Sequence, residues 1–166
     1  MTEQQYNQMV DRIRNTRHGV TIVRLLNKLI TYGTELFYPI LLAYIYIYHD
    51  MQLLYQCILV PGVSYVVVST YRRYNHSKRP YEVSDIQPLI IKHTKEKSFP
   101  SRHVFAIFMI AMTALQVSIP IAIIIFACGI LLGCLRVIGG VHFPKDVIAG
   151  AVIGILCGCI GYYLIF

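Results

Sequence analysis

Long uncharged stretches dominate the second half of this 166-residue chain. No charged side chain occurs between His103 and Arg136, and none occurs between Val147 and Phe166. A helix needs about 20 apolar residues to cross the hydrocarbon core of a bilayer, so each stretch is long enough to contain a membrane span. The alternative is a soluble protein with deeply buried helices. It fits poorly, because uncharged runs of this length rarely occur in a fold that faces water.

Apolar runs and the turn signals between them predict an all-α, polytopic bundle of about five transmembrane helices. The expected spans lie within residues 20–49, 51–71, 101–117, 121–135 and 144–166. Because Arg24, Lys28 and Glu35 lie in the first range, either that span starts near Ile30 or these charges face other parts of the protein. In the last span, small residues recur every fourth position and would let helices approach closely, namely Gly150, Gly154 and Gly158.

Residues 1–18 form a polar, mildly basic segment ahead of the transmembrane domain, which we place at residues 19–166. The segment lacks the apolar core of a cleavable signal peptide. Its few apolar side chains recur at nearly helical spacing, so an amphipathic helix lying in the membrane interface is one interpretation. A frayed terminus is the other.

Composition supports the membrane assignment, and the distribution of charge makes the two ends of the bundle different. Only 14% of the residues are charged, whereas a soluble domain usually carries about a quarter. In a five-span arrangement, the N-terminus, the polar loop 72–99 and the turn 139–145 share one side. All 15 Lys and Arg residues lie on or toward that side, and the opposite side carries Asp50 and no basic residue.

Three short clusters of polar side chains fall at the basic end of the predicted bundle. Together they supply four arginines, two histidines, a serine and a carboxylate. In chain order, the clusters are Arg72-x6-Arg79-Pro80, Pro100-Ser101-Arg102-His103 and Arg136-x5-His142-x3-Asp146.

These residue types suit the chemistry of a phosphate ester. Arginine forks match phosphate oxygens in pairs, and the N–H groups at the start of a helix capped by Ser101 would be available to the anion. Phosphoryl transfer also needs a nucleophile and a proton donor, and imidazole titrates near neutral pH. The two histidines can fill these roles, and Asp146 can hold one imidazole in the required tautomer.

Each residue also has a simpler explanation. Arg72 and Arg79 could anchor the protein at lipid headgroups, Arg136 suits the end of a helix, and Asp146 suits the first turn of one. The pair His142 and Asp146 could belong to a metal site, but no further ligand cluster supports one. All the simple explanations would have to hold together for three clusters on one surface, which favours a shared phosphate site.

The three clusters resemble the three-part signature of the type 2 phosphatidic-acid phosphatase family, which is related to vanadium haloperoxidases. That signature reads Lys-x6-Arg-Pro, Pro-Ser-Gly-His and Ser-Arg-x5-His-x3-Asp, and every internal spacing is kept from Arg72 to Asp146. This chain departs from the signature at Arg72 for lysine, Arg102 for glycine and Leu135 for serine. The family commonly has six spans, so one is missing here ahead of the first cluster.

The resemblance implies a role for each matched residue. His142 is expected to be the nucleophile that forms a phosphohistidine, Asp146 its orienting partner, and His103 the acid that protonates the leaving group. The expected phosphate-binding residues are Arg72, Arg79, Ser101, Arg136 and Arg102, of which Arg102 can reach a second phosphate or a headgroup. The resemblance implies no metal ion, and we expect no cofactor.

The sequence therefore predicts a metal-independent hydrolase whose partner is a membrane lipid and not a nucleic acid. The expected substrate is a lipid phosphate or diphosphate of the undecaprenyl diphosphate, phosphatidylglycerol phosphate or phosphatidic acid class. Two alternatives stay open, a non-catalytic carrier of lipid phosphates and a phosphotransferase that uses the same covalent intermediate. The oligomeric state is also left open.

Two arguments about the orientation in the membrane conflict. The positive-inside rule places the basic end in the cytoplasm, and the arginines of the N-terminal segment agree with it. The family resemblance implies the opposite orientation, and phosphate binding accounts for part of the basic excess. We therefore expect a multi-pass protein of the cell membrane whose active site faces the extracytoplasmic side.

Overall fold

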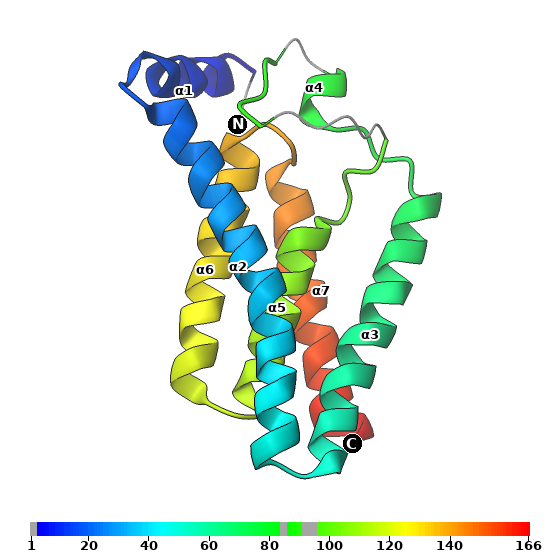
Figure 1. The fold of residues 1–166 in the computed structure, drawn as a ribbon. Helices are drawn as coiled ribbons and strands as arrows, with labels where there is room; N and C mark the ends of the chain where they lie inside the picture. Colours follow the sequence, from blue (N-terminus) through cyan, green and yellow to red (C-terminus); the bar gives the residue numbers. More distant parts are fainter. Residues whose placement is uncertain (1–2, 84–85, 91–95) are drawn as a thin grey trace.

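The computed structural model describes residues 3–83, 86–90 and 96–166 and shows a helical bundle (Figure 1). No strand occurs within these described ranges, and the predicted all-α membrane bundle is confirmed. In chain order, the helices are α1 (Glu3–Asn15), α2 (Gly19–Tyr48), α3 (Met51–Tyr74), α4 (Pro80–Val83), α5 (Arg102–Leu115), α6 (Ile119–Ile138) and α7 (Pro144–Ile160), which a π-helical turn (Gly161–Ile165) continues.

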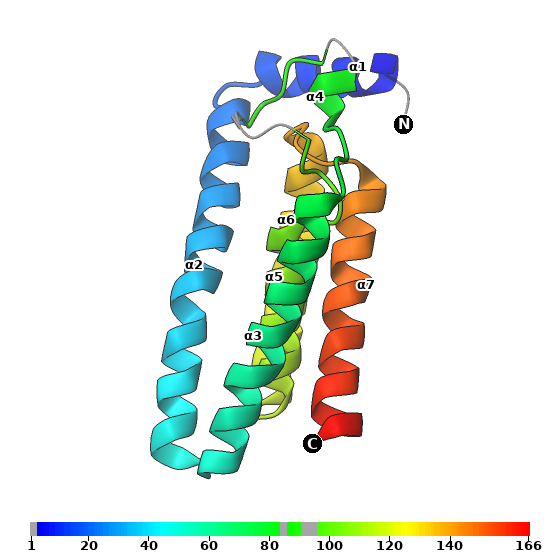
Figure 2. The same ribbon diagram turned by 90° about the vertical axis from the view of Figure 1, so that its right-hand side faces the viewer.

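Four helices are long and apolar enough to cross a membrane: α2, α3, α6, and α7 with its π-helical turn. The fifth expected span, 101–117, is the shorter helix α5, which has 14 residues and is only about 21 Å long at 1.5 Å per residue. Helix α5 contacts α2, α3, α6 and α7, and ten of its residues are buried. The bundle therefore has four long helices around a short central one, as Figures 1 and 2 show from two sides.

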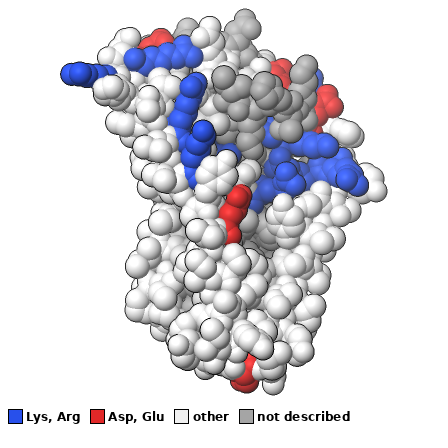
Figure 3. Space-filling model, in the orientation of Figure 1, with Lys and Arg blue, Asp and Glu red and all other residues white. Residues whose placement is uncertain are grey.

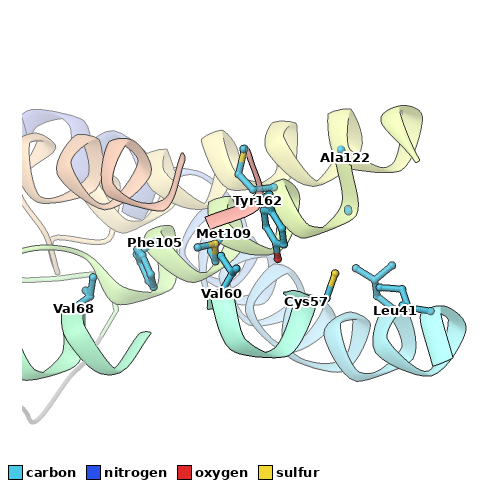
Figure 4. Close-up of a cluster of buried hydrophobic side chains, with 11 residues drawn as sticks. Leu41, Cys57, Val60, Val68, Phe105, Met109, Ala122 and Tyr162 are labelled. Carbon is cyan, nitrogen blue, oxygen red and sulfur yellow. The ribbon is translucent and has the colours of Figure 1, made fainter. Parts of the chain in front are cut away.

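The main apolar core lies around α5, and the outer faces of the long helices are apolar as well. Phe105 and Met109 of α5 belong to one buried cluster with Val60 of α3 and Tyr162 of the last helix (Figure 4). On the outside, large apolar side chains of every long helix are exposed, among them Ile40, Val66, Ile124 and Leu156. Lipid tails are as apolar as such side chains, so these faces suit a bilayer.

The glycines of α7 allow it to lie directly against α5. A Cβ atom at Gly150 would lie 2.6 Å from the carbonyl oxygen of Ser101, and one at Gly154 would lie 2.8 Å from that of Phe105. Any larger side chain would push the helices apart, which confirms the packing role predicted for this spacing. The close approach also places the start of α7 beside the start of α5.

Helix α1 crosses the end of the bundle that carries α4 (Figures 1 and 2). Its side chains Tyr6 and Val10 are 3% and 2% exposed, so the interpretation of this segment as a frayed terminus is wrong for Glu3–Asn15. Its position in the membrane interface stays a prediction. Helix α2 starts at Gly19 instead of near Ile30, and the Nε of Arg24 donates to the carbonyl oxygen of Leu89 at 2.7 Å. One of the three charges in the first span therefore faces the loop that follows α3.

Candidate active site

Polar and charged side chains are buried together at one end of the bundle. Figure 3 shows that Lys and Arg gather at the end that carries α1 and α4, while most of the remaining surface in this view is uncharged. Seven side chains at this end, none more than 6% exposed, form what we call the buried cluster: Arg72, Arg79, Ser98, Ser101, Arg136, His142 and Asp146. A buried charge is costly unless it is paired or hydrogen-bonded, so the partners of these groups show how the site is built.

Four members of the buried cluster lie at helix ends. Arg72 and Arg136 lie in the last turns of α3 and α6, while Ser101 and Asp146 lie at the starts of α5 and α7. The start of α7 is held by the backbone N–H of Phe143, which donates to Oδ2 of Asp146 at 3.0 Å. The backbone N–H of Ser101 donates to the carbonyl oxygen of Asp146 at 2.9 Å, which joins the two helix starts.

Two arginines are held by backbone carbonyls of the segments around them. Arg72 donates to the carbonyl oxygens of Lys97, Ser98 and Pro100. Arg79 donates to the carbonyl oxygen of Val141 at 3.0 Å and to that of Lys97 at 3.2 Å. Burial lowers the pKa of Arg79 from its ordinary value. The guanidinium group of Arg72 is thus fixed by neutral acceptors, which leaves its charge available to a bound anion.

His142 is oriented through one of its two ring nitrogens. Its Nδ1 lies 3.3 Å from Oγ of Ser98 and 3.6 Å from Oδ2 of Asp146, and the Ser98 hydroxyl donates to the same Oδ2. A carboxylate at Nδ1 favours the tautomer that carries the proton there, which leaves a lone pair on Nε2. Burial lowers the pKa of His142 to about 4, an effect that the bond to Asp146 opposes in part. The imidazole is therefore neutral near pH 7 and can act as a nucleophile.

Some buried donors at the site have no partner among the described residues. The hydroxyl of Ser101 and the Nε of Arg136 are buried without a hydrogen bond to this part of the chain, although Nη2 of Arg136 donates to Thr31 at 3.2 Å. The first backbone N–H groups of a helix such as α5 also lack partners within the helix. Leaving a buried polar group unsatisfied costs about 1–3 kcal/mol. A bound oxyanion would satisfy these donors, so the arrangement fits a phosphate site.

Arg102 and His103 lie next to the buried cluster and outside it. His103 is half-buried in the first turn of α5, whereas Arg102 is exposed. Arg102 lines a cavity of about 400 Å³ that we call the outer pocket, formed by Tyr65, Val66, Ser69, Thr70, Arg72, Arg73, Lys97 and Arg102. Arg72 thus belongs to both the buried cluster and the outer pocket.

A separate, apolar cavity lies next to the outer pocket, nearer the middle of the bundle. It has a volume of about 260 Å³, shares Tyr65 with the outer pocket, and reaches Phe105 and Met109 of α5. A polar and an apolar cavity that share a wall match the two parts of an amphiphile.

Three residues that contact the predicted site or the turn beside it carry no signal in the sequence. Ser98 binds both His142 and Asp146, and Thr31 binds Arg136. The hydroxyl of Tyr6 donates to the carbonyl oxygen of Ile138 at 3.1 Å. It also fills the space where a Cβ atom at Gly140 would lie, only 2.3 Å away, and Gly140 has a φ of +72°. No sequence spacing signals these contacts, because each joins segments far apart in the chain.

Possible metal ligands are sparse in the described ranges. Within them, no three His, Cys, Asp or Glu side chains come together as a group that could hold a metal ion. Metal independence itself stays a prediction from the family resemblance.

Comparison with known proteins agrees with this geometry. The sequence model of the PAP2 superfamily matches residues 51–166, which include all three clusters. The crystal structure of Aquifex aeolicus LpxE is similar with a TM-score of 0.72 and 28% sequence identity, over 93% of each chain. A second similar fold, at a TM-score of 0.74 and 21% identity, covers 96% of this chain and 84% of the other. That structure is of a transmembrane PAP2 type phosphatidylglycerolphosphate phosphatase from Bacillus subtilis. No curated protein shows significant similarity to the sequence.

Proposed function

The chain belongs to the PAP2 superfamily, and on this premise we propose that it is a metal-independent phosphatase that hydrolyses a lipid phosphate or diphosphate through a phosphohistidine. The observation that carries the proposal is the orientation of His142. Its Nδ1 faces Ser98 and Asp146 at 3.3 and 3.6 Å, and the buried Arg79 and Arg72 interact electrostatically with the imidazole. A carrier would need the arginines but not an oriented, neutral imidazole.

The proposed reaction has two steps. Nε2 of His142 attacks the phosphorus, so that an N–P bond forms while the P–O bond to the leaving alcohol or phosphate breaks, and His103 gives its proton to the leaving oxygen. A water molecule then attacks the phosphohistidine, the P–N bond breaks, and His103 takes the proton from that water. Arg72, Arg79 and Arg136, with Ser101 and the start of α5, stabilise the charge that builds on the phosphoryl oxygens.

The form of the site favours a lipid as substrate. The outer pocket carries basic side chains, and the apolar cavity beside it lies between α2, α3 and α5. A phosphorylated headgroup could occupy the first while its tail stays among apolar side chains. One similar structure is named a phosphatidylglycerolphosphate phosphatase. This class, undecaprenyl diphosphate and phosphatidic acid are the substrates that we put forward for test.

Phosphate release from a panel of purified lipid phosphates tests the proposal. The wild-type protein in detergent is expected to release phosphate from at least one lipid, to keep its activity in EDTA, and to be inhibited by vanadate. Transfer of the phosphoryl group to an added lipid or sugar acceptor, without release to water, would support the phosphotransferase alternative. Tight lipid binding without release or transfer would contradict the proposal and favour a carrier, and strict dependence on a divalent ion would contradict the mechanism.

We further propose that the active site faces the extracytoplasmic side of the cell membrane. The buried cluster requires several of the basic residues at its end for anion binding, which weakens the positive-inside argument. His76 is exposed at this end. In a cysteine-free background, a cysteine substituted for His76 is expected to react with an impermeant thiol reagent added to whole cells. Labelling only after the membrane is opened would place the site in the cytoplasm.

A further inference from the structure

The outer pocket contains positive charge that the proposed reaction does not use. The side chains of Arg73, Lys97 and Arg102 are exposed and line the cavity together with Arg72. No Asp or Glu lines it, and no carboxylate of the described residues forms an ion pair with any of these four side chains. Like charges so close together repel one another, so the pocket gains most from a ligand that carries negative charge.

A buried hydroxyl in the same pocket also lacks a partner. Oγ of Ser69 on α3 is buried and forms no hydrogen bond with the described part of the chain, although Ser69 lines the cavity. Its Oγ is covered in this conformation, but rotation about χ1 would turn the hydroxyl into the cavity, where it can donate to an anion. The cavity volume of about 400 Å³ lies in the range of about 300–1,000 Å³ that is usual for small-molecule sites. Charge, an unpaired donor and volume thus coincide at one place.

Arg72 places this cavity beside the reaction centre. It lines the outer pocket and also donates to the carbonyl oxygens of Ser98 and Pro100. The Ser98 side chain contacts His142 and Asp146. Arg102 and Ser101 are neighbours in the chain, yet Arg102 is exposed toward the outer pocket while Ser101 is buried in the cluster. A ligand that fills both sites therefore needs two anionic groups a short distance apart.

We propose that the outer pocket binds a second anionic group of the same lipid, held by Arg73, Lys97, Arg102 and Ser69. This inference rests on the proposed function and narrows it. The preferred substrate carries two phosphate groups, as a lipid diphosphate or a phosphatidylglycerol phosphate does, whereas phosphatidic acid carries one. The buried cluster binds the phosphoryl group that is transferred, and the outer pocket selects for the other.

Equilibrium binding of two non-hydrolysable amphiphiles tests this subsite without turnover. The probes are an alkyl methylenediphosphonate and an alkyl phosphonate with the same chain, both in the same detergent. Wild-type protein is expected to bind the diphosphonate more tightly than the phosphonate. In the double variant Arg73→Gln/Arg102→Gln, that preference should fall by about tenfold or more, because two charged donors to the second anionic group are lost.

A matched variant controls for the loss of charge alone. Arg12 is exposed on α1 at the same end of the bundle and does not line the outer pocket, so Arg12→Gln should keep the wild-type preference. An unchanged preference in the double variant would overturn the inference, and so would an equal loss in Arg12→Gln. Thermal unfolding of each variant shows whether the fold is kept, and the single variant Arg102→Gln, at an exposed position, serves if the double variant unfolds.

Two further measurements distinguish this subsite from a site for free phosphate and from the proposed function itself. If free phosphate fills the pocket, added inorganic phosphate will tighten binding of the monophosphonate in wild type but not in the double variant, which would overturn the assignment to the same lipid. If wild type prefers the diphosphonate yet releases phosphate from no lipid, the proposed function fails while the subsite stands. If the protein releases phosphate from lipids but binds the diphosphonate no more tightly than the phosphonate, the proposed function stands and the subsite is overturned.

Discussion

The buried cluster and the outer pocket share Arg72 and a strongly basic character, but they hold their charges in different ways. In the buried cluster, backbone carbonyls and hydroxyl groups fix each arginine, and burial excludes water. In the outer pocket, Arg73, Lys97 and Arg102 are exposed and form no ion pair within the described chain. Fixed groups in a water-poor site stabilise a transition state strongly, whereas mobile, screened cations attract anions at a longer range. We therefore expect the first region to control the rate and the second to control the choice of lipid.

The largest expected effect is the loss of the proposed nucleophile in the buried cluster. His142→Ala should lower kcat at least about 10⁴-fold, as removal of a nucleophile does in other covalent enzymes. Binding of the non-hydrolysable diphosphonate should be kept, because the outer pocket is intact. Phosphate release and equilibrium binding measure the two effects. Residual turnover within tenfold of wild type would exclude His142 as the nucleophile. It would also contradict the expectation that the buried cluster controls the rate.

The next largest effects are expected from two serine substitutions, one in each region. Ser98→Ala removes the hydroxyl that contacts both His142 and Asp146 and should lower kcat by about 10- to 100-fold. Ser69→Ala, in the outer pocket, should instead raise KM for a two-phosphate lipid by about threefold. Ser118 at the opposite end of the bundle forms no side-chain cap bond to α6, so Ser118→Ala is the matched control. Steady-state kinetics with one two-phosphate lipid measure kcat and KM for each variant. A change in KM alone for Ser98→Ala, with a change in kcat alone for Ser69→Ala, would contradict the different roles of the two regions.

A smaller effect is expected from the contact between α1 and the turn that carries His142. Tyr6→Phe removes the hydrogen bond to the carbonyl oxygen of Ile138 and opens space beside Gly140, so kcat should fall by about three- to tenfold with little change in KM. Tyr46→Phe, on the exposed face of α2, provides the control. If kcat falls only in proportion to the folded fraction measured by thermal unfolding, Tyr6 supports the fold and does not position the turn.

The smallest signal is the titration of His142 itself. Burial lowers the pKa of its imidazole to about 4. The ring is therefore uncharged from pH 7 down to about pH 5 and gains its proton only below that. Because the folded pKa lies below the ordinary one, protonation favours the unfolded chain, and the stability that this group contributes above pH 6.5 is lost as the pH falls toward 4. NMR titration of the ring proton that disappears in His142→Gln measures this pKa. A midpoint near 6.5 would mean that the site is open to water like the outer pocket.

The candidate site was largely predictable because its signature is local in sequence. The spacing from His142 to Asp146 joins the turn before α7 to the first turn of that helix, and the placement of polar clusters at helix ends follows from where apolar runs stop. The structure brings most of the predicted residues into one buried cluster, and it places Arg102 in a separate cavity. The division between the two regions could not be predicted, because it depends on which side of α5 each neighbouring residue faces.

The predicted helices were right in kind and less accurate in length. Composition cannot separate a lipid-facing span from a buried central helix, since both are apolar. For this reason 101–117 was expected to be a full span, whereas α5 is a 14-residue helix enclosed by the others. Residues 1–18 were ambiguous for a similar reason, because a few apolar side chains at helical spacing become a stable helix only where a surface such as the turn at Gly140 can receive them.

The sequence by itself determined that this protein is a helical membrane protein with a phosphate-binding signature at one end. Hydrophobic runs need only hydrocarbon around them, and helix backbones satisfy their own hydrogen bonds, so these features require no knowledge of distant contacts. Only the tertiary structure decided that Ser98 contacts both His142 and Asp146, that Tyr6 reaches the turn that carries His142, and that a basic cavity lies beside the buried cluster. Each of these depends on side chains that meet across the bundle, where packing in three dimensions, and not spacing along the chain, sets the partners.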